Sequence, residues 1–184
     1  GLQVYAEFAD LYGQDVDFRR DGYLYLLSDQ ASLENFTEQV AVHNRHGVPS
    51  AIVDPEEAKR ISPLIRPDDL VGACWSPRDG KATPEAVVMG YAAAARRHGA
   101  RIVRHCEVLD ITRRGATITG VVTAHGTVAT GVVVCAAGAW SAAIGDMLGI
   151  TIPVTPVRRQ IAFTEPVADL PAHSPSLTID FPSN

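Results

Sequence analysis

Three small residues, Ala136, Ala137 and Gly138, directly follow a continuous apolar run at residues 132–135. Such a run predicts a strand that is covered on both faces, as in a parallel sheet. Ligands of open α/β sheets bind at the carboxyl ends of these strands, where small side chains let a ligand approach the backbone. The pattern therefore predicts a ligand-contacting turn, although the same residues would also let a helix pack on the sheet.

A dinucleotide site needs two further features. One is a GxGxxG loop that opens a helix and holds the pyrophosphate, and the other is an acidic residue for the ribose. The chain has 15 glycines, but their spacing nowhere forms GxGxxG. We therefore expect the main phosphate anchor of such a site to lie outside these residues.

Other residue types that could do chemistry give weaker patterns. Arg158 and Arg159 could each pair bidentately with a carboxylate or a phosphate, but neighbours on a strand point to opposite faces, so at most one can face a ligand. The alternative for each is a surface salt bridge. Ser141 is not in a G-x-S-x-G motif, which disfavours hydrolysis. His43 and His46 share a helix face without a third ligand, so no metal site is predicted.

Periodicity and capping signals indicate which elements would position these residues. Helices are expected at residues 29–46, 55–62, 84–98 and 139–148. Single strands are expected at residues 23–27, 48–53, 70–76, 101–104, 152–155 and 159–164. Three further β-rich runs, separated by tight turns, predict an antiparallel meander at residues 106–111, 117–123 and 127–129.

Composition is that of a globular protein. The 184 residues are 46% hydrophobic and 20% charged. The net charge of −5, without a block of like charges, argues against nucleic acid or an anionic membrane as partners. Cys74, Cys106 and Cys135 all fall in expected strands, which indicates buried thiols in a reducing compartment. With neither a signal peptide nor a long apolar run in the sequence, a cytoplasmic location is expected.

The order of motifs along the chain resembles one family. The motifs are DG-x-x-x-P at residues 79–84, GA-x-I at 99–102, EV-x-x-I at 107–111 and VVV-x-AAGAWS at 132–141. This order resembles the FAD-dependent oxidoreductases of the D-amino-acid oxidase superfamily, especially the sarcosine oxidase, dimethylglycine dehydrogenase and glycine oxidase group. The likeness extends over nearly the whole chain and implies FAD as the cofactor.

The resemblance also implies roles for individual residues. Val108 matches the position whose backbone pairs with the adenine edge. The turn beside the cofactor is matched by Ala136, Ala137 and Gly138, and Trp140 matches an aromatic next to that turn. Without the resemblance, Val108 is interpreted as a core valine and Trp140 as an aromatic packed on the sheet.

Two residues are candidates for the substrate side. Arg158 lies in a segment that, in the resembled family, is near the active site. Asp180 lies in a segment that resembles the one approaching the flavin face.

We expect an α/β (mixed α+β) fold with two parts. Residues 78–149 would form part of an FAD-binding Rossmann-like domain that includes the meander. Residues 1–77 and 150–184 would supply elements of a mixed-sheet substrate domain. The resembled family's N-terminal GxGxxG unit and C-terminal flavin segment are absent from the sequence, so the chain is interpreted as an internal fragment that is inactive alone.

The functional hypothesis is a fragment of an FAD-dependent amine or amino-acid oxidoreductase. It would oxidise a C–N bond of a sarcosine-, glycine- or dimethylglycine-type substrate by hydride transfer to flavin, with a subunit partner in a hetero-oligomer left open. The alternative is a non-catalytic module that binds small carboxylates or forms a subunit interface. An NAD-dependent Rossmann enzyme is disfavoured by the meander. The substrate, the electron acceptor and the mode of flavin attachment stay open.

Overall fold

A computed structural model describes residues 1–165 and 176–181. The chain divides into two compact units, residues 1–100 with 167–184 and residues 101–166. Both units are built from helices and strands, so the expected mixed α/β fold is confirmed. In the part of the chain that the structure describes, no helix has the length and apolar character needed to cross a membrane.

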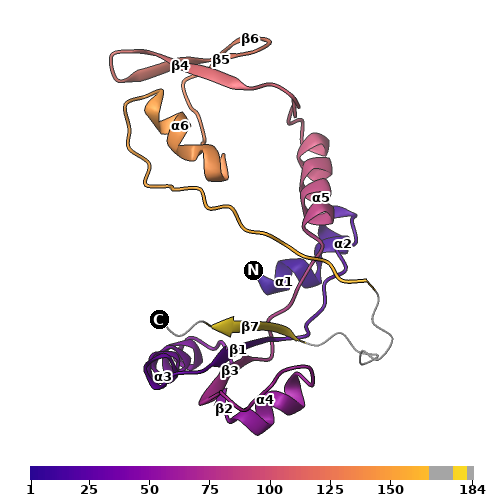
Figure 1. The fold of residues 1–184 in the computed structure, drawn as a ribbon. Coiled ribbons are helices and arrows are strands. Elements are labelled where there is room, and N and C mark those ends of the chain that lie inside the picture. Colours follow the sequence, from indigo (N-terminus) through magenta and orange to yellow (C-terminus); the bar gives the residue numbers. More distant parts are fainter. Residues whose placement is uncertain (166–175, 182–184) are drawn as a thin grey trace. The chain divides into compact units, whose positions relative to one another are not determined.

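The first unit contains a mixed four-stranded sheet in the order β2-β3-β1-β7. Strand β1 pairs antiparallel with β3 and parallel with β7, while β2 pairs antiparallel with β3 (Figure 1). The predicted strand at residues 23–27 is confirmed, whereas the next two begin later than expected. The bounds are β1 Tyr23–Leu27, β2 Ala51–Val53, β3 Gly72–Ser76 and β7 Leu177–Phe181.

Two helices, α3 (Gln30–Arg45) and α4 (Pro55–Ile61), cover opposite faces of this sheet. Successive side chains of a strand alternate between its faces. Leu27 accordingly joins a core cluster with Phe36 of α3, whereas Leu24 shares another cluster with Ala58 of α4. The hydrophobic core of the first unit is therefore split between the two sides of the sheet.

The starts of both helices were predictable from their capping residues. The Asp29 carboxylate accepts a hydrogen bond from the Ser32 amide at 2.8 Å, and the Asp54 carboxylate accepts one from the Glu57 amide at 2.7 Å. Each bond satisfies an amide that has no partner inside its helix. The local signals for these two helices are confirmed.

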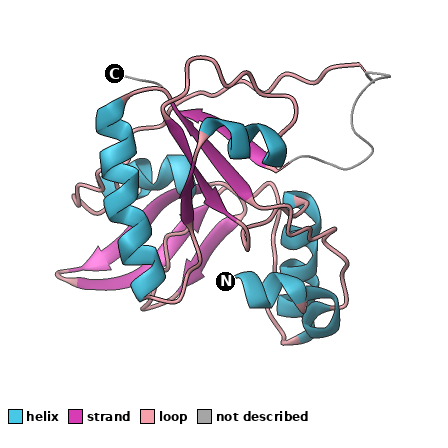
Figure 2. Cartoon of the chain, turned by 90° about the horizontal axis from the view of Figure 1, so that it is seen from below, coloured by secondary structure: helices cyan, strands magenta, loops and turns pink. Residues whose placement is uncertain are grey.

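Helix α5 (Pro84–Arg97) packs against the short helix α2 (Phe8–Tyr12), which follows another short helix, α1 (Leu2–Ala6), at the N-terminus (Figures 1 and 2). The Phe8 ring is fully buried, with its centroid 5.0 Å from that of Tyr91. The helix starts at Pro84, as predicted, and is followed by Gly99 at φ +86°, but its N-cap Thr83 makes no side-chain hydrogen bond to the helix.

The second unit contains the predicted meander. Its strands are β4 (Val108–Arg114), β5 (Thr117–Thr123) and β6 (Gly126–Ala129), paired antiparallel in chain order. Ile111 of β4 is buried. Instead of one helix at residues 139–148, the chain forms a 3₁₀ turn, η1 (Gly138–Trp140), and a shorter helix, α6 (Ser141–Asp146).

The predictions of four strands in the second unit are wrong. Residues 101–104, 132–135, 152–155 and 159–164 have no strand pairing in the structure. A strand requires a neighbour for its backbone N–H and C=O groups, and the described residues offer none to these runs. The consequence is clearest at Val134, whose side chain is 85% exposed instead of covered.

The prediction of three buried strand thiols is also wrong for two of them. Cys74 is buried in β3, but Cys106 is half-buried and Cys135 is exposed, and neither lies in a strand. All three thiols are free. Cys135 is exposed because residues 132–135 form no strand, whereas Cys106 lies outside the meander because β4 begins only at Val108.

Candidate functional site

The turn formed by Ala136, Ala137 and Gly138 lies in the second unit and exposes its backbone. Ala136 and Gly138 are exposed and Ala137 is half-buried. Gly138 adopts φ +55°, and a Cβ at this position would meet no atom within 4 Å. The Ala137 carbonyl accepts a hydrogen bond from the Trp140 amide at 3.1 Å, which closes the turn into η1. A ligand can therefore approach the backbone here, although no strand precedes the turn.

Val108 and Trp140 belong to the same unit as this turn. Val108 is half-buried at the first position of β4, where it pairs with Thr123 next to a β-bulge. The Trp140 side chain is 75% exposed, so it is not the sheet-packed aromatic that the alternative interpretation required. The contacts of both residues with a cofactor stay predictions.

The structure assigns the two substrate-side candidates to different units. Arg158 is exposed in the second unit and lies outside any strand. The strand geometry that would point Arg158 and Arg159 to opposite faces is therefore absent. Asp180 is exposed on β7 of the first unit, opposite Leu26 of β1. The next residue, Phe181, packs its ring at 5.2 Å from the ring of Phe36, which fixes this end of β7 against α3.

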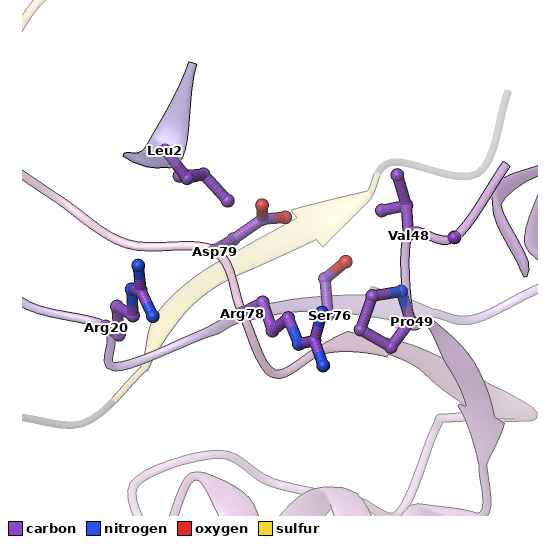
Figure 3. A pocket seen from close by; sticks show the side chains of 8 residues that line it. Leu2, Arg20, Val48, Pro49, Ser76, Arg78 and Asp79 are labelled. Atoms are coloured by element: carbon purple, nitrogen blue, oxygen red, sulfur yellow. The ribbon is translucent and has the colours of Figure 1, made fainter. Parts of the chain in front are cut away.

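Sequence reasoning missed a cavity of about 280 Å³ in the first unit (Figure 3). Its charged and polar lining consists of Arg20, Ser76, Arg78 and Asp79. Arg20 lies just before β1, Ser76 ends β3, and the other two follow in the next turn. These segments meet because Tyr23 pairs with Ser76 in the β1–β3 ladder. The long-range register creates the cavity, and no local sequence signal could have indicated it.

The negative charge of Asp79 acts on two neighbouring side chains of the sheet. Burial raises the pKa of the Tyr25 hydroxyl, and the negative charge of Asp79 raises it further. The same two causes, in the same order, raise the pKa of the Cys74 thiol. The Asp79 charge thus raises the pKa of two side chains, Tyr25 and Cys74, in the cluster that packs against α3. Cys74 stays a neutral thiol.

Within residues 1–165 and 176–181, Arg20, Arg78 and Asp79 form no ion pair. The nearby pair of the Lys81 ammonium and the Asp21 carboxylate, at 3.0 Å, uses other groups. Across the same described residues, His, Cys, Asp and Glu side chains do not gather in a group of three that could hold a metal ion.

Comparison with known proteins places these features in a family. The family described as "FAD dependent oxidoreductase" matches residues 1–183. Mitochondrial sarcosine dehydrogenase of Homo sapiens is 30% identical over 88% of this chain and 18% of that protein. Sarcosine oxidase subunit beta of Arthrobacter sp is 27% identical over 83% of this chain and 39% of that protein.

Solved structures show the same likeness. L-proline dehydrogenase from P. horikoshii is 35% identical, with a TM-score of 0.73 over 81% of this chain and 39% of that structure. Glycine oxidase from Geobacillus kaustophilus is 26% identical, with a TM-score of 0.69 over 84% of this chain and 43% of that structure. The chain thus spans less than half the length of each of these relatives. Because the family match extends over nearly all of its residues, the chain belongs to the FAD-dependent oxidoreductase family.

Proposed function

We propose that the chain is part of an FAD-dependent oxidoreductase that oxidises the carbon next to the nitrogen of a small amine or amino acid. The observation that carries the proposal is the family match over residues 1–183. The substrate class, of the sarcosine, dimethylglycine or glycine type, is supported by the names of the relatives that match the chain.

The residues of the second unit fit part of a cofactor site. FAD, when bound, supplies a two-electron acceptor for the hydride of the substrate. FAD could approach the backbone at the small residues Ala136, Ala137 and Gly138. Trp140 would offer an exposed aromatic face beside this turn. Val108 would contribute backbone groups at the start of β4. The chain has no GxGxxG loop, so these five residues would provide peripheral contacts and not the pyrophosphate anchor.

Two residues are proposed for the substrate side. The Arg158 guanidinium is exposed and forms no ion pair within the described residues, so it is available to a substrate carboxylate. Asp180 is exposed on an edge strand, where its carboxylate is open to a ligand.

A subunit partner and a cytoplasmic location complete the proposal. The partner is supported by the relative named as subunit beta of sarcosine oxidase. The location is supported by three free thiols, which fit a reducing compartment. The sarcosine and dimethylglycine dehydrogenases that match the chain are named as mitochondrial proteins, so fractionation of cells that express the protein should compare both compartments.

A second candidate function is a non-catalytic module that binds small carboxylates. It is favoured by the cavity in the first unit, where two guanidinium groups have no ion-pair partner in the described chain. This activity would require no flavin.

The test is the visible absorbance spectrum of the full-length protein, recorded anaerobically before and after addition of N-methyl and free amino acids. We expect a flavin spectrum that bleaches with one of these substrates. A colourless protein that does not take up FAD would overturn the enzymatic proposal and favour the binding module.

A matched pair of glycine variants tests the proposed cofactor turn. Gly138→Val adds a branched side chain at a positive φ and should weaken FAD retention by about tenfold or more, because the backbone is no longer open. At Gly131 a Cβ would meet no atom within 4 Å and φ is not positive, so Gly131→Ala should retain FAD like the wild type. Equal retention by both variants would exclude the turn from the cofactor site.

A further inference from the structure

We propose that the cavity in the first unit binds an amino dicarboxylic acid, with Arg20 and Arg78 holding the two carboxylates and Asp79 holding the ammonium group. This binding site is built from the first unit alone and does not depend on flavin chemistry. We refer to it as the Arg20–Arg78 cavity.

The charges of the cavity determine the ligand class. Figure 3 shows Arg20, Arg78 and Asp79 around one opening, and none of them forms an ion pair within the described residues. Guanidinium groups match the planar geometry of carboxylates, and a carboxylate accepts hydrogen bonds from an ammonium. Two positive charges and one negative charge are complemented by two carboxylates and one ammonium.

A buried hydroxyl pair supplies a polar wall. The Ser76 hydroxyl lines the cavity and lies 3.0 Å from the Ser50 hydroxyl, and both residues are 8% exposed. The Ser50 hydroxyl also lies 3.4 Å from Nδ1 of His43. Because a hydroxyl can accept one hydrogen bond while it donates another, Ser76 can accept from Ser50 and donate to a ligand carboxylate.

The remaining walls limit the size of the ligand. Leu2, Val48 and Pro49 give the cavity an apolar side. A volume of about 280 Å³ is near the lower end of the range for small-molecule sites, roughly 300 Å³ and above, so a compact ligand fits better than a peptide or a nucleotide.

Ligands that lack one carboxylate or the amine should bind more weakly, because a charged group of the cavity then has no partner. A monocarboxylic amino acid leaves one guanidinium without a partner, and a dicarboxylic acid without an amine leaves Asp79 without one. A hydrogen bond to a charged group contributes about 1.5–3 kcal/mol, which corresponds to tenfold or more in affinity.

The first experiment uses isothermal titration of the full chain with three probes: L-glutamate, glutarate, which lacks the amine, and 2-aminobutyrate, which lacks the second carboxylate. We expect L-glutamate to bind at least tenfold more tightly than either of the others. Equal affinity for the three compounds, or no binding of L-glutamate, would overturn the proposal. Because no flavin is involved, this result is independent of the absorbance test of the proposed function.

Charge-neutralising variants then assign the roles within the cavity. Asp79→Asn should remove the preference for L-glutamate over glutarate, while Arg78→Gln should remove the preference for L-glutamate over 2-aminobutyrate. Arg96→Gln, an exposed arginine of α5 outside the cavity, is the matched control and should bind L-glutamate like the wild type. If the control loses as much affinity as Arg78→Gln, binding reflects overall charge and the site is wrong.

Discussion

At the residue scale, Gly22 connects the backbone of the Arg20–Arg78 cavity to two other segments of the chain. Its amide donates a hydrogen bond to the Asp79 carbonyl at 2.9 Å, and its carbonyl accepts one from the Leu177 amide at 3.1 Å. It adopts φ +75°, and a Cβ at this position would overlap the ring of Trp75. Glycine is therefore required both for the backbone conformation and for the space beside the indole.

Replacing Gly22 tests this double requirement. Gly22→Ala should lower the free energy of unfolding by about 3 kcal/mol or more, because left-handed strain adds to a steric clash with Trp75. Gly13→Ala is a matched control, since Gly13 has φ +73° but open space around its Cβ position, and it should cost only about 1–2 kcal/mol. Urea denaturation measures both values, and equal losses would mean that the Trp75 contact is unimportant.

At the element scale, α3 is held at both of its ends. The Asp29 carboxylate caps its N-terminus, and the Asn44 side chain near its C-terminus exchanges two hydrogen bonds of 3.1 Å with the Ser50 backbone. The second contact leads the chain into β2 and brings Ser50 next to Ser76. Helix α3 thus links a local capping signal to the polar wall of the cavity.

The cap predicts a pH dependence of stability. The hydrogen bond from the Ser32 amide holds the pKa of Asp29 below its ordinary value of 3.8. A carboxyl with a lowered folded-state pKa stabilises the protein above its unfolded pKa, and this contribution is lost as the pH falls through the folded value. Asp29→Ala should therefore be less stable than the wild type at neutral pH, with a difference that shrinks below pH 3.8.

Urea titrations at neutral and acidic pH measure this difference. Glu38→Ala is a suitable control because Glu38 is an exposed carboxylate on the same helix and makes no side-chain hydrogen bond among the residues described. It should change stability by less than about 0.5 kcal/mol at neutral pH. A pH-independent loss in Asp29→Ala would show that the ionised cap does not contribute.

Capping signals also explain which elements could be predicted. The starts of α3 and α4 depend on groups only three residues apart, such as Asp54 and the Glu57 amide, so the sequence contains the whole interaction. The strand expected at residues 132–135 depends instead on a partner strand, and the described residues provide none. Hydrophobicity alone cannot supply that partner, and the prediction failed for this reason.

At the scale of the whole molecule, the second unit exposes several large apolar side chains. Val132, Val134, Ile161 and Phe163 are between 76% and 92% exposed. Single exposed apolar residues are normal, but several large ones in one unit favour association or dye binding.

Removing two of these side chains should reduce that tendency. Val134→Ser with Phe163→Ser should lower the fluorescence of a bound hydrophobic dye, while the free energy of unfolding changes by less than about 0.5 kcal/mol because neither side chain is packed. The control pair Thr127→Ser with Thr151→Ser, also at exposed positions, should leave the fluorescence unchanged. Unaltered dye binding in the first pair would mean that these side chains do not form the apolar surface.

The sequence by itself determined the family, the cofactor class and several elements that local signals specify. The order of the motifs predicted the family. The capping residues predicted α3 and α4, and the tight turns predicted the meander of β4, β5 and β6. Five cofactor-side residues could be named from the resemblance, but their contacts with FAD stay predictions.

Only the tertiary structure decided what depends on distant pairing. The register of β1 with β3 brings Arg20 to the turn that contains Arg78 and Asp79, which are more than fifty residues further along the chain. The same dependence left Val134 exposed, because its backbone has no neighbour within the described residues. Local sequence specifies turns, caps and periodicity, whereas a charged cavity forms only where the fold brings separate segments together.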